Sequence, residues 1–160
     1  MIESAPVLAR RWPIVGWVAR VLRWLDTVPY ALLAIPLRFA VATVFWNSGM
    51  SKIPSWDSTI ALFNDEYKVP VLPPELAAYM AVTIELTTPV LLVLGLFTRP
   101  AALVLLAMTA VIQIFVYPLA WPTHIQWAAM LLVLLARGPG QFSLDWLIQL
   151  RLVDRPGEKR

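Results

Sequence analysis

The strongest constraint on this chain is a set of four apolar runs, each about long enough to cross a lipid bilayer. They occupy roughly residues 30–50, 75–97, 100–119 and 123–137. A membrane-spanning helix needs about 20 predominantly apolar residues. Backbone amides inside a bilayer must find their partners within a helix or a closed barrel. The sequence therefore predicts an all-α membrane bundle of four spanning helices, forming one domain over residues 29–137.

The amino-acid composition agrees with a lipid environment. Hydrophobic residues make up 59% of the 160 residues and charged residues only 14%, whereas soluble domains carry about 25% charged residues. The net charge of +3 does not indicate nucleic acid, because the basic residues stand at the ends of apolar runs rather than along a stripe. We expect the lipid bilayer, and not nucleic acid, to be the main partner.

Both flanks of the bundle read as interfacial. Residues 1–28 are expected to be a retained cytoplasmic tail followed by an amphipathic helix over 12–27, with Trp17 and Leu22 on its apolar face. Tryptophan and arginine beside apolar residues are typical of a helix that lies in the membrane interface. A simple extension of the first span is the alternative. Residues 138–160 predict a second interfacial helix and a charged cytoplasmic tail.

The distribution of basic residues predicts the orientation. If both termini are cytoplasmic, Lys52 and Lys68 lie outside and Arg38 lies within the membrane, and the remaining basic residues are inside: Arg10, Arg11, Arg20, Arg23, Arg99, Arg137, Arg151, Arg155, Lys159 and Arg160. Cytoplasmic loops are enriched in Lys and Arg. We therefore expect a multi-pass protein of the inner-membrane type with both termini in the cytoplasm.

Two charged residues interrupt the apolar runs. Arg38 lies in the first run and Glu85 in the second. Counted from the ends of their spans at about 1.5 Å per residue, both reach the bundle midplane. A charge there is costly and marks a functional candidate, so we predict a buried Arg38–Glu85 pair. The pair either fixes helix register or lines a pocket for a ligand or proton.

Further polar residues extend this candidate pocket for a ligand or proton toward the outer face. They are Asn47, Lys52, Gln113 and His124. Each also has a plain explanation, such as snorkelling for Lys52, a bond across helices for Gln113 and an interfacial position for His124. Trp46, Trp56, Trp121 and Trp127 gather at the same end, where they form an aromatic belt or wall a flat ligand.

The residues that bind common redox cofactors are scarce. The sequence has no cysteine and one histidine, which excludes disulfides, thiolate metal sites, iron–sulfur clusters, covalently attached c-type haem and bis-histidine haem within one chain. We expect no metal site and no covalently bound cofactor. Any redox carrier would be a diffusible molecule such as a quinone, or belong to a protein partner.

Three segments together resemble the DoxX family of small bacterial membrane proteins. They are LRFAVATVFWNSGMSKI (37–53), ELTTPVLLVLGLFTRPAALVLLAM (85–108) and GPGQFSLDWL (138–147). The shared features are an arginine and a Gly-x-x-Lys ending in the first span, a glutamate in the second, Gly-Leu-x-Thr-Arg at the turn, and then Gly-Pro-Gly and Ser-Leu-Asp. The resemblance covers about residues 30–147 and implies a four-helix membrane bundle.

The resemblance also implies a setting for the function. Relatives resemble subunits of thiosulfate:quinone oxidoreductase or are linked to membrane complexes that handle oxidative or thiol stress. Arg38, Glu85 and His124 would then be candidates for a quinone or proton site. Three functions stay open: a redox-associated membrane subunit, a non-catalytic anchor or scaffold within a larger complex, and, ranked behind them, a small-solute or proton transporter. The sequence does not decide whether the chain is an enzyme.

Overall fold

The computed structural model describes residues 13–153, with side chains for residues 15–152. The predicted cytoplasmic ends of the chain, with Arg10, Arg11, Arg155, Lys159 and Arg160, lie outside the described residues. The chain divides into two compact units, residues 1–30 and residues 31–160.

The described part of the first unit is the helix α2 (Pro13–Asp26). Its large apolar side chains face outward, with Trp17 64% and Trp24 66% exposed. The helix ends in a turn at Thr27 and Val28, where backbone amides bond to Trp24 and Leu25. Pro29 follows before the next helix, so α2 is a separate amphipathic helix and not a continuous extension of the first span. Its exposed apolar residues suit the membrane interface.

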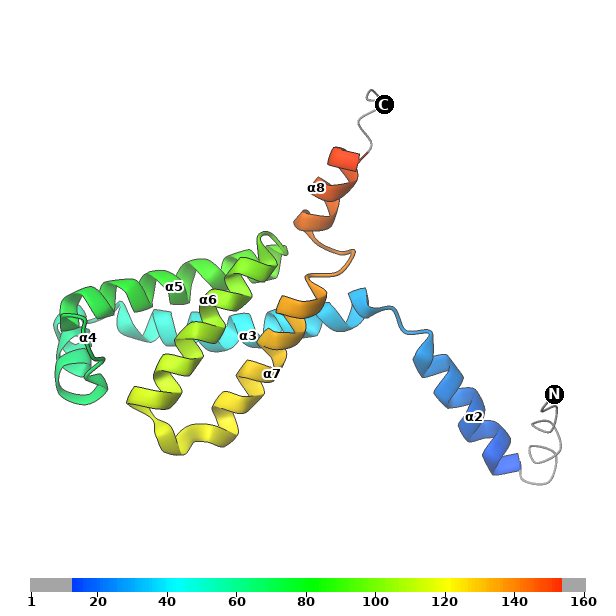
Figure 1. Cartoon of the computed structure of the whole chain (residues 1–160), viewed down its shortest axis with the longest axis horizontal. Coiled ribbons are helices and arrows are strands. Elements are labelled where there is room, and N and C mark those ends of the chain that lie inside the picture. Colours follow the sequence, from blue (N-terminus) through cyan, green and yellow to red (C-terminus); the bar gives the residue numbers. More distant parts are fainter. Residues whose placement is uncertain (1–12, 154–160) are drawn as a thin grey trace. The chain divides into compact units, whose positions relative to one another are not determined.

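The second unit contains four helices that are long and apolar enough to cross a membrane. They are α3 (Tyr30–Lys52), α5 (Pro74–Leu94), α6 (Thr98–Val111) with its π-helical continuation η2 (Ile112–Val116), and α7 (Trp121–Arg137) preceded by the 3-10 turn η3 (Pro118–Ala120) (Figure 1). Residues 13–153 contain no strand. The predicted all-α bundle of four spanning helices is confirmed.

The turn between the second and third spans is placed by glycine. Helix α5 ends at Leu94 because Gly95 adopts the left-handed conformation, with φ of 64°, which costs glycine no side-chain clash. The predicted second span, 75–97, is therefore three residues too long at its end. Helix α6 starts at Thr98 rather than at residue 100, and α5 and α6 run as neighbours.

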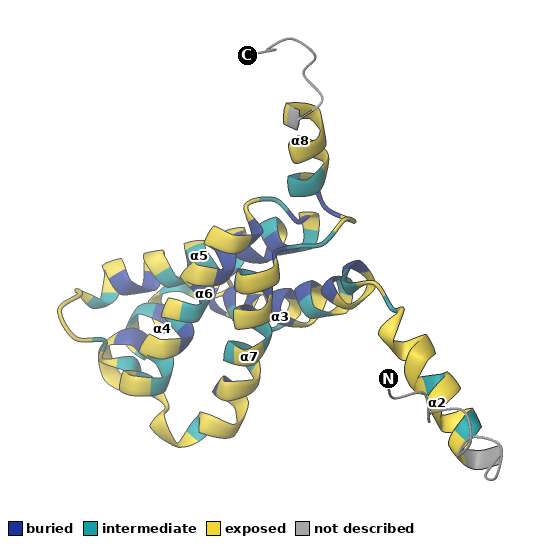
Figure 2. Cartoon of the chain, turned by 45° about the vertical axis from the view of Figure 1, so that its right-hand side comes forward, coloured by how far each residue is buried: buried dark blue, intermediate teal, exposed yellow. Residues whose placement is uncertain are grey.

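All four spanning helices contribute to one apolar core. The buried members are Val41 and Phe45 of α3, Leu92 of α5, Ala101, Ala102 and Leu105 of α6, and Leu131 and Leu134 of α7. Figure 2 shows buried positions on the facing sides of the helices and exposed positions on the outer sides. The exposed residues include Phe39, Leu103 and Leu132. Outward apolar side chains of this kind require lipid, because water would not solvate them favourably.

Residues 51–74, between the first and second predicted spans, contain four prolines and yet are folded rather than an open loop. They form α4 (Trp56–Leu62) and the π-helical turn η1 (Phe63–Tyr67). Phe63 is buried against Ala77 and Ala78 of α5. The four prolines of this segment bound these short helices rather than prevent them, since helix breakers act only at their own positions. At the end of α3, Thr59 of α4 donates to the Lys52 carbonyl (2.7 Å).

The C-terminal segment holds the other end of the bundle together. The helix α8 (Leu144–Val153) places the Asp145 carboxylate at the start of α6, where it accepts hydrogen bonds from the amides of Phe97 (2.8 Å) and Thr98 (3.0 Å). The Asp145 amide in turn donates to the Gly95 carbonyl (2.9 Å). A carboxylate at a helix N-terminus satisfies orphan N–H groups and the helix dipole.

Candidate ligand-binding cavity

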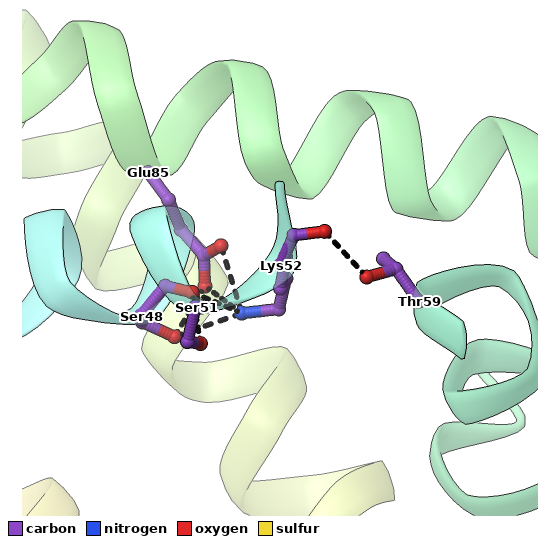
Figure 3. Close-up of polar contacts among 5 residues, drawn as sticks. All are labelled: Ser48, Ser51, Lys52, Thr59 and Glu85. Atoms are coloured by element: carbon purple, nitrogen blue, oxygen red, sulfur yellow. Dashed lines mark hydrogen bonds and ion pairs between the residues drawn. The ribbon is translucent and has the colours of Figure 1, made fainter. Parts of the chain in front are cut away.

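A buried ion pair joins the first and second spans. The Lys52 ammonium group at the end of α3 donates to both carboxylate oxygens of Glu85 in the middle of α5, each at 2.9 Å (Figure 3). Ser48, one turn before Lys52, donates its hydroxyl hydrogen to Glu85 Oε1 (2.8 Å) and accepts from Lys52 Nζ (2.8 Å). Lys52 is 6% and Glu85 2% exposed, so the two charges neutralise each other away from solvent.

This geometry corrects the partner predicted for Glu85. A buried pair between Glu85 and a basic residue is present, and Arg38 is buried as expected, but the base that contacts Glu85 is Lys52. Arg38 instead donates from Nη2 to the Phe142 carbonyl (2.9 Å), beside Gly95 and Ser143. Arg38 therefore belongs with the C-terminal segment that caps α6. Lys52 does not snorkel, because its ammonium group is buried and bonds to Glu85 and Ser48. Thr59 of α4 donates to the Lys52 carbonyl (2.7 Å; Figure 3).

The Lys52–Glu85 pair stands in the wall of a cavity of about 400 Å³. The rest of the wall is mostly apolar and includes the aromatic side chains of Phe45, Phe63 and Trp127. Phe45 and Trp127 meet edge to face with ring centroids 5.6 Å apart. Met80 and Val111 also line the cavity and are 46% and 37% exposed, so the cavity reaches the outer surface of the bundle. An apolar cavity with a few convergent polar groups is the usual form of a small-molecule site.

His124 lines the same cavity and its orientation is set by Gln113. Its Nδ1 lies 2.7 Å from Gln113 Oε1, and the Gln113 amide nitrogen donates to the Pro118 carbonyl (2.7 Å). A carbonyl can only accept, so the Gln113 nitrogen faces Pro118 and its oxygen faces His124. His124 is 3% exposed. This contact joins the third and fourth spans and fixes the orientation of the histidine ring.

Two tyrosines from outside the spans complete the cavity wall. Tyr67 of η1 and Tyr117, between η2 and η3, pack edge to face at 5.7 Å. The Tyr117 hydroxyl donates to the exposed Glu66 carboxylate, which links the segment after α3 to the α6–α7 turn. Burial, with smaller contributions from the Glu85 and Glu66 carboxylates, raises the pKa of Tyr67. The bond to Glu66, followed by burial, raises the pKa of Tyr117, so both hydroxyls stay protonated at neutral pH.

The remaining predicted site residues lie elsewhere. Asn47 is exposed on the outer side of α3 and does not line the cavity. Among the four tryptophans at the outer end, Trp127 lines the cavity, whereas Trp46 (40% exposed) and Trp121 (55% exposed) face outward. Within the described residues no group of three or more metal-ligating side chains comes together. Of the six site candidates, Lys52, Glu85 and His124 line the cavity. Gln113 does not line it but bonds to His124.

Ser48, Tyr67 and Tyr117 are the polar groups that the sequence prediction missed. A signal for Ser48 existed, because it precedes Lys52 by four residues and so shares its helix face. For the tyrosines there was no such signal, because they lie outside the four spans. Only the folding of η1 and of the α6–α7 turn brings them together.

Fold and cavity together define a class: a four-helix membrane protein with a buried lysine–glutamate pair in the wall of an apolar cavity. The sequence profile of DoxX matches residues 33–118, a range that includes Lys52, Glu85 and most of the cavity wall. The chain belongs to the DoxX family.

Two relatives support this membership. The chain is similar to the inner membrane protein YphA of Escherichia coli (strain K12), with 31% identity over 128 residues, covering 71% of this chain and 89% of YphA. It is also similar to an uncharacterized protein of Haemophilus influenzae (strain ATCC 51907 / DSM 11121 / KW20 / Rd), with 29% identity over 128 residues, covering 71% of this chain and 81% of that protein. No solved structure matches the chain.

Proposed function

We propose that this chain is a redox-associated inner-membrane subunit that binds a quinone-type carrier in the cavity beside Lys52 and Glu85. The observation that carries the proposal is the cavity itself, about 400 Å³ in size. Ligand sites in proteins range over about 300–1,000 Å³ and combine apolar walls with a few polar groups. A carrier that diffuses within the bilayer needs such a cavity to be reachable from the lipid-facing side, where Met80 and Val111 are exposed.

The lining of the cavity fits a flat ring that carries oxygen substituents. Phe45, Phe63 and Trp127 offer aromatic faces and edges against which a ring can stack. Glu85, His124 and Tyr67 offer polar atoms in an otherwise apolar wall. When bound, a quinone would supply two-electron redox chemistry that this chain's own residues do not provide. The chain itself would bind the ring, orient its oxygens and exclude water.

The same proposal includes a location and an orientation. The name of YphA supports the bacterial inner membrane, and the basic residues of the described segments are consistent with cytoplasmic termini: Arg20, Arg23, Arg99, Arg137 and Arg151. The burial of Lys52 removes one of the two basic residues expected outside, which strengthens the asymmetry required by the positive-inside rule.

The test compares two alanines of α6 that differ only in what they face. Ala107 and Ala110 are both exposed, but only Ala107 lines the cavity. After purification in mild detergent with native lipid, bound quinones are extracted and quantified by mass spectrometry. We expect one equivalent of carrier, counted as quinone plus quinol, with the unchanged protein and with Ala110→Trp, and its loss with Ala107→Trp, because the indole would occupy the cavity. Absence of the carrier from all three proteins would contradict the proposal.

A non-catalytic anchor or scaffold is the second candidate, favoured by one observation. Helix α2 lies in a unit of its own and exposes Trp17, Leu22 and Trp24, which suits attachment to a membrane surface or a partner. Mass spectrometry of the intact purified complex distinguishes the two candidates. A stoichiometric partner without quinone supports the scaffold, whereas quinone that is lost on Ala107→Trp supports the carrier site.

A further inference from the structure

The charged and imidazole groups of the cavity wall keep open hydrogen-bond acceptors but no free donor. The Lys52 ammonium group has no hydrogen left for a ligand. It has three hydrogens and four acceptors within 3.1 Å: the two oxygens of Glu85, the hydroxyl of Ser48 and the carbonyl of Ser48 (Figure 3). All its hydrogens are therefore directed at protein atoms. Although Lys52 lines the cavity, it has no N–H left to donate to a ligand carbonyl.

Glu85 retains an acceptor. Its Oε1 accepts from both Ser48 and Lys52, whereas its Oε2 accepts from Lys52 alone. A carboxylate offers about four lone-pair sites, so one site on Oε2 is open. Glu85 is 2% exposed and lines the cavity. A ligand in the cavity can satisfy this oxygen only by donating a hydrogen bond to it.

His124 retains a second acceptor. Because Gln113 presents its oxygen to Nδ1, the neutral imidazole carries its hydrogen on Nδ1 and leaves Nε2 as a lone pair. No hydrogen bond to Nε2 occurs among residues 13–153, and the ring is 3% exposed in the cavity wall. Nε2 is not among the described side-chain atoms that are fully buried without a partner, so it remains accessible to a hydrogen-bond donor in the cavity. The hydroxyl of Tyr67 can donate or accept and does not discriminate.

From this arrangement we infer that the cavity selects the reduced, dihydroxy form of an aromatic carrier, a quinol, over the oxidised quinone, through hydroxyl donation to His124 Nε2 and Glu85 Oε2. This inference rests on the proposed function and specifies its ligand. A quinone has only carbonyl oxygens, which accept; placed against Nε2 and a carboxylate, they leave both protein acceptors unpaired and face them with like partial charge. Gln113 is the positioning residue, since it sets which nitrogen of His124 is the acceptor.

The binding test uses three probes that share one methylated ring: duroquinol, its dimethyl ether and duroquinone. Equilibrium binding is measured without oxygen to the protein in lipid nanodiscs, with empty nanodiscs to correct for partition into lipid. We expect duroquinol to bind about tenfold or more tightly than the other two, the difference that one satisfied buried acceptor provides. In His124→Phe this preference should shrink toward equality, and in Gln126→Met, an exposed position on the same helix, it should persist.

The tautomer is observable directly because His124 is the only histidine. In tag-free protein labelled with 15N-histidine, we expect the protonated signal from Nδ1 and the unprotonated signal from Nε2. Gln113→Met should mix the tautomers and lower the duroquinol preference, a change that a purely structural role for Gln113 would not produce. A hydrogen on Nε2 in the unchanged protein, or equal binding of duroquinone, overturns the quinol preference alone. If none of the three probes binds, the proposed carrier site is wrong as well.

Discussion

Lys52 at the end of α3 donates to both carboxylate oxygens of Glu85 on α5 at 2.9 Å, although 32 residues separate the two in the sequence. Gly49 and Ser48 make this contact possible, because Gly49 lets the two helices approach and Ser48 binds both charged groups. The consequences can be tested by measuring stability, titration and helix packing.

Removing one partner of the Lys52–Glu85 pair should lower the free energy of unfolding more than removing both partners. Lys52→Met or Glu85→Gln leaves one buried charge unpaired and should each lower the free energy of unfolding by about 3–5 kcal/mol. The Lys52→Met, Glu85→Gln double variant should lose less than either single variant. Thermal unfolding in one detergent measures all three, and Lys68→Met, at an exposed lysine, should change little. A double variant as unstable as the sum of the single variants would show that the two groups do not interact.

The close approach of α3 and α5 depends on the absence of a side chain at Gly49. A Cβ atom there would lie 2.8 Å from Leu86 Cδ2 and 3.0 Å from Glu85 Cβ. Small residues permit such approach between membrane helices, so Gly49→Ala should destabilise the bundle by about 1–3 kcal/mol through overpacking. Thermal unfolding again provides the measurement. Gly16→Ala, in the helix of the other unit, is the matched substitution and should leave unfolding of the bundle unchanged.

Asp145 caps a helix that lies 47 residues earlier in the chain. Asp145→Ala removes the acceptor for the amides of Phe97 and Thr98 and should cost about 1–2 kcal/mol, the range for loss of an N-cap. Amide hydrogen exchange should rise locally in the first turn of α6. The control is Asp26→Ala at the exposed end of α2, for which exchange in α6 should stay the same. Unaltered exchange in Asp145→Ala would mean that α6 needs no cap.

Tyr67 and Tyr117 should lose their hydroxyl protons at a higher pH than ordinary tyrosines do. The pKa of Tyr67 and that of Tyr117 are both raised from the ordinary value of 10.0, so the folded protein holds these protons after the unfolded chain releases them. The stabilisation is therefore complete below about pH 10 and is lost as the pH rises through the folded-state values. Phenolate absorbance in an alkaline titration measures this. Tyr67→Phe and Tyr117→Phe should each reduce the late component, and an undiminished late component in both would refute the assignment.

Much of the fold could be predicted because it depends on local composition. Each of the four spans is an apolar segment of the right length, and lipid admits only helices or closed barrels for such segments. The ends of the spans were less predictable. Gly95 ends α5 through its left-handed conformation, and the residues after Lys52 fold into α4 and η1 by packing on Ala77 and Ala78, which no periodicity in that segment indicates.

The sequence by itself determined that charged residues are buried in this membrane protein. Arg38 and Glu85 interrupt apolar runs, and runs of this length must cross the bilayer. Only the tertiary structure decided their partners. Depth counted along ideal helices brings Arg38 and Glu85 to one level, but Glu85 pairs with Lys52 at the end of α3. The C-terminal segment binds Arg38 instead. A count of residues gives depth along one helix, whereas contact between two side chains depends on helix rotation, on close approach at Gly49 and on what covers each helix end.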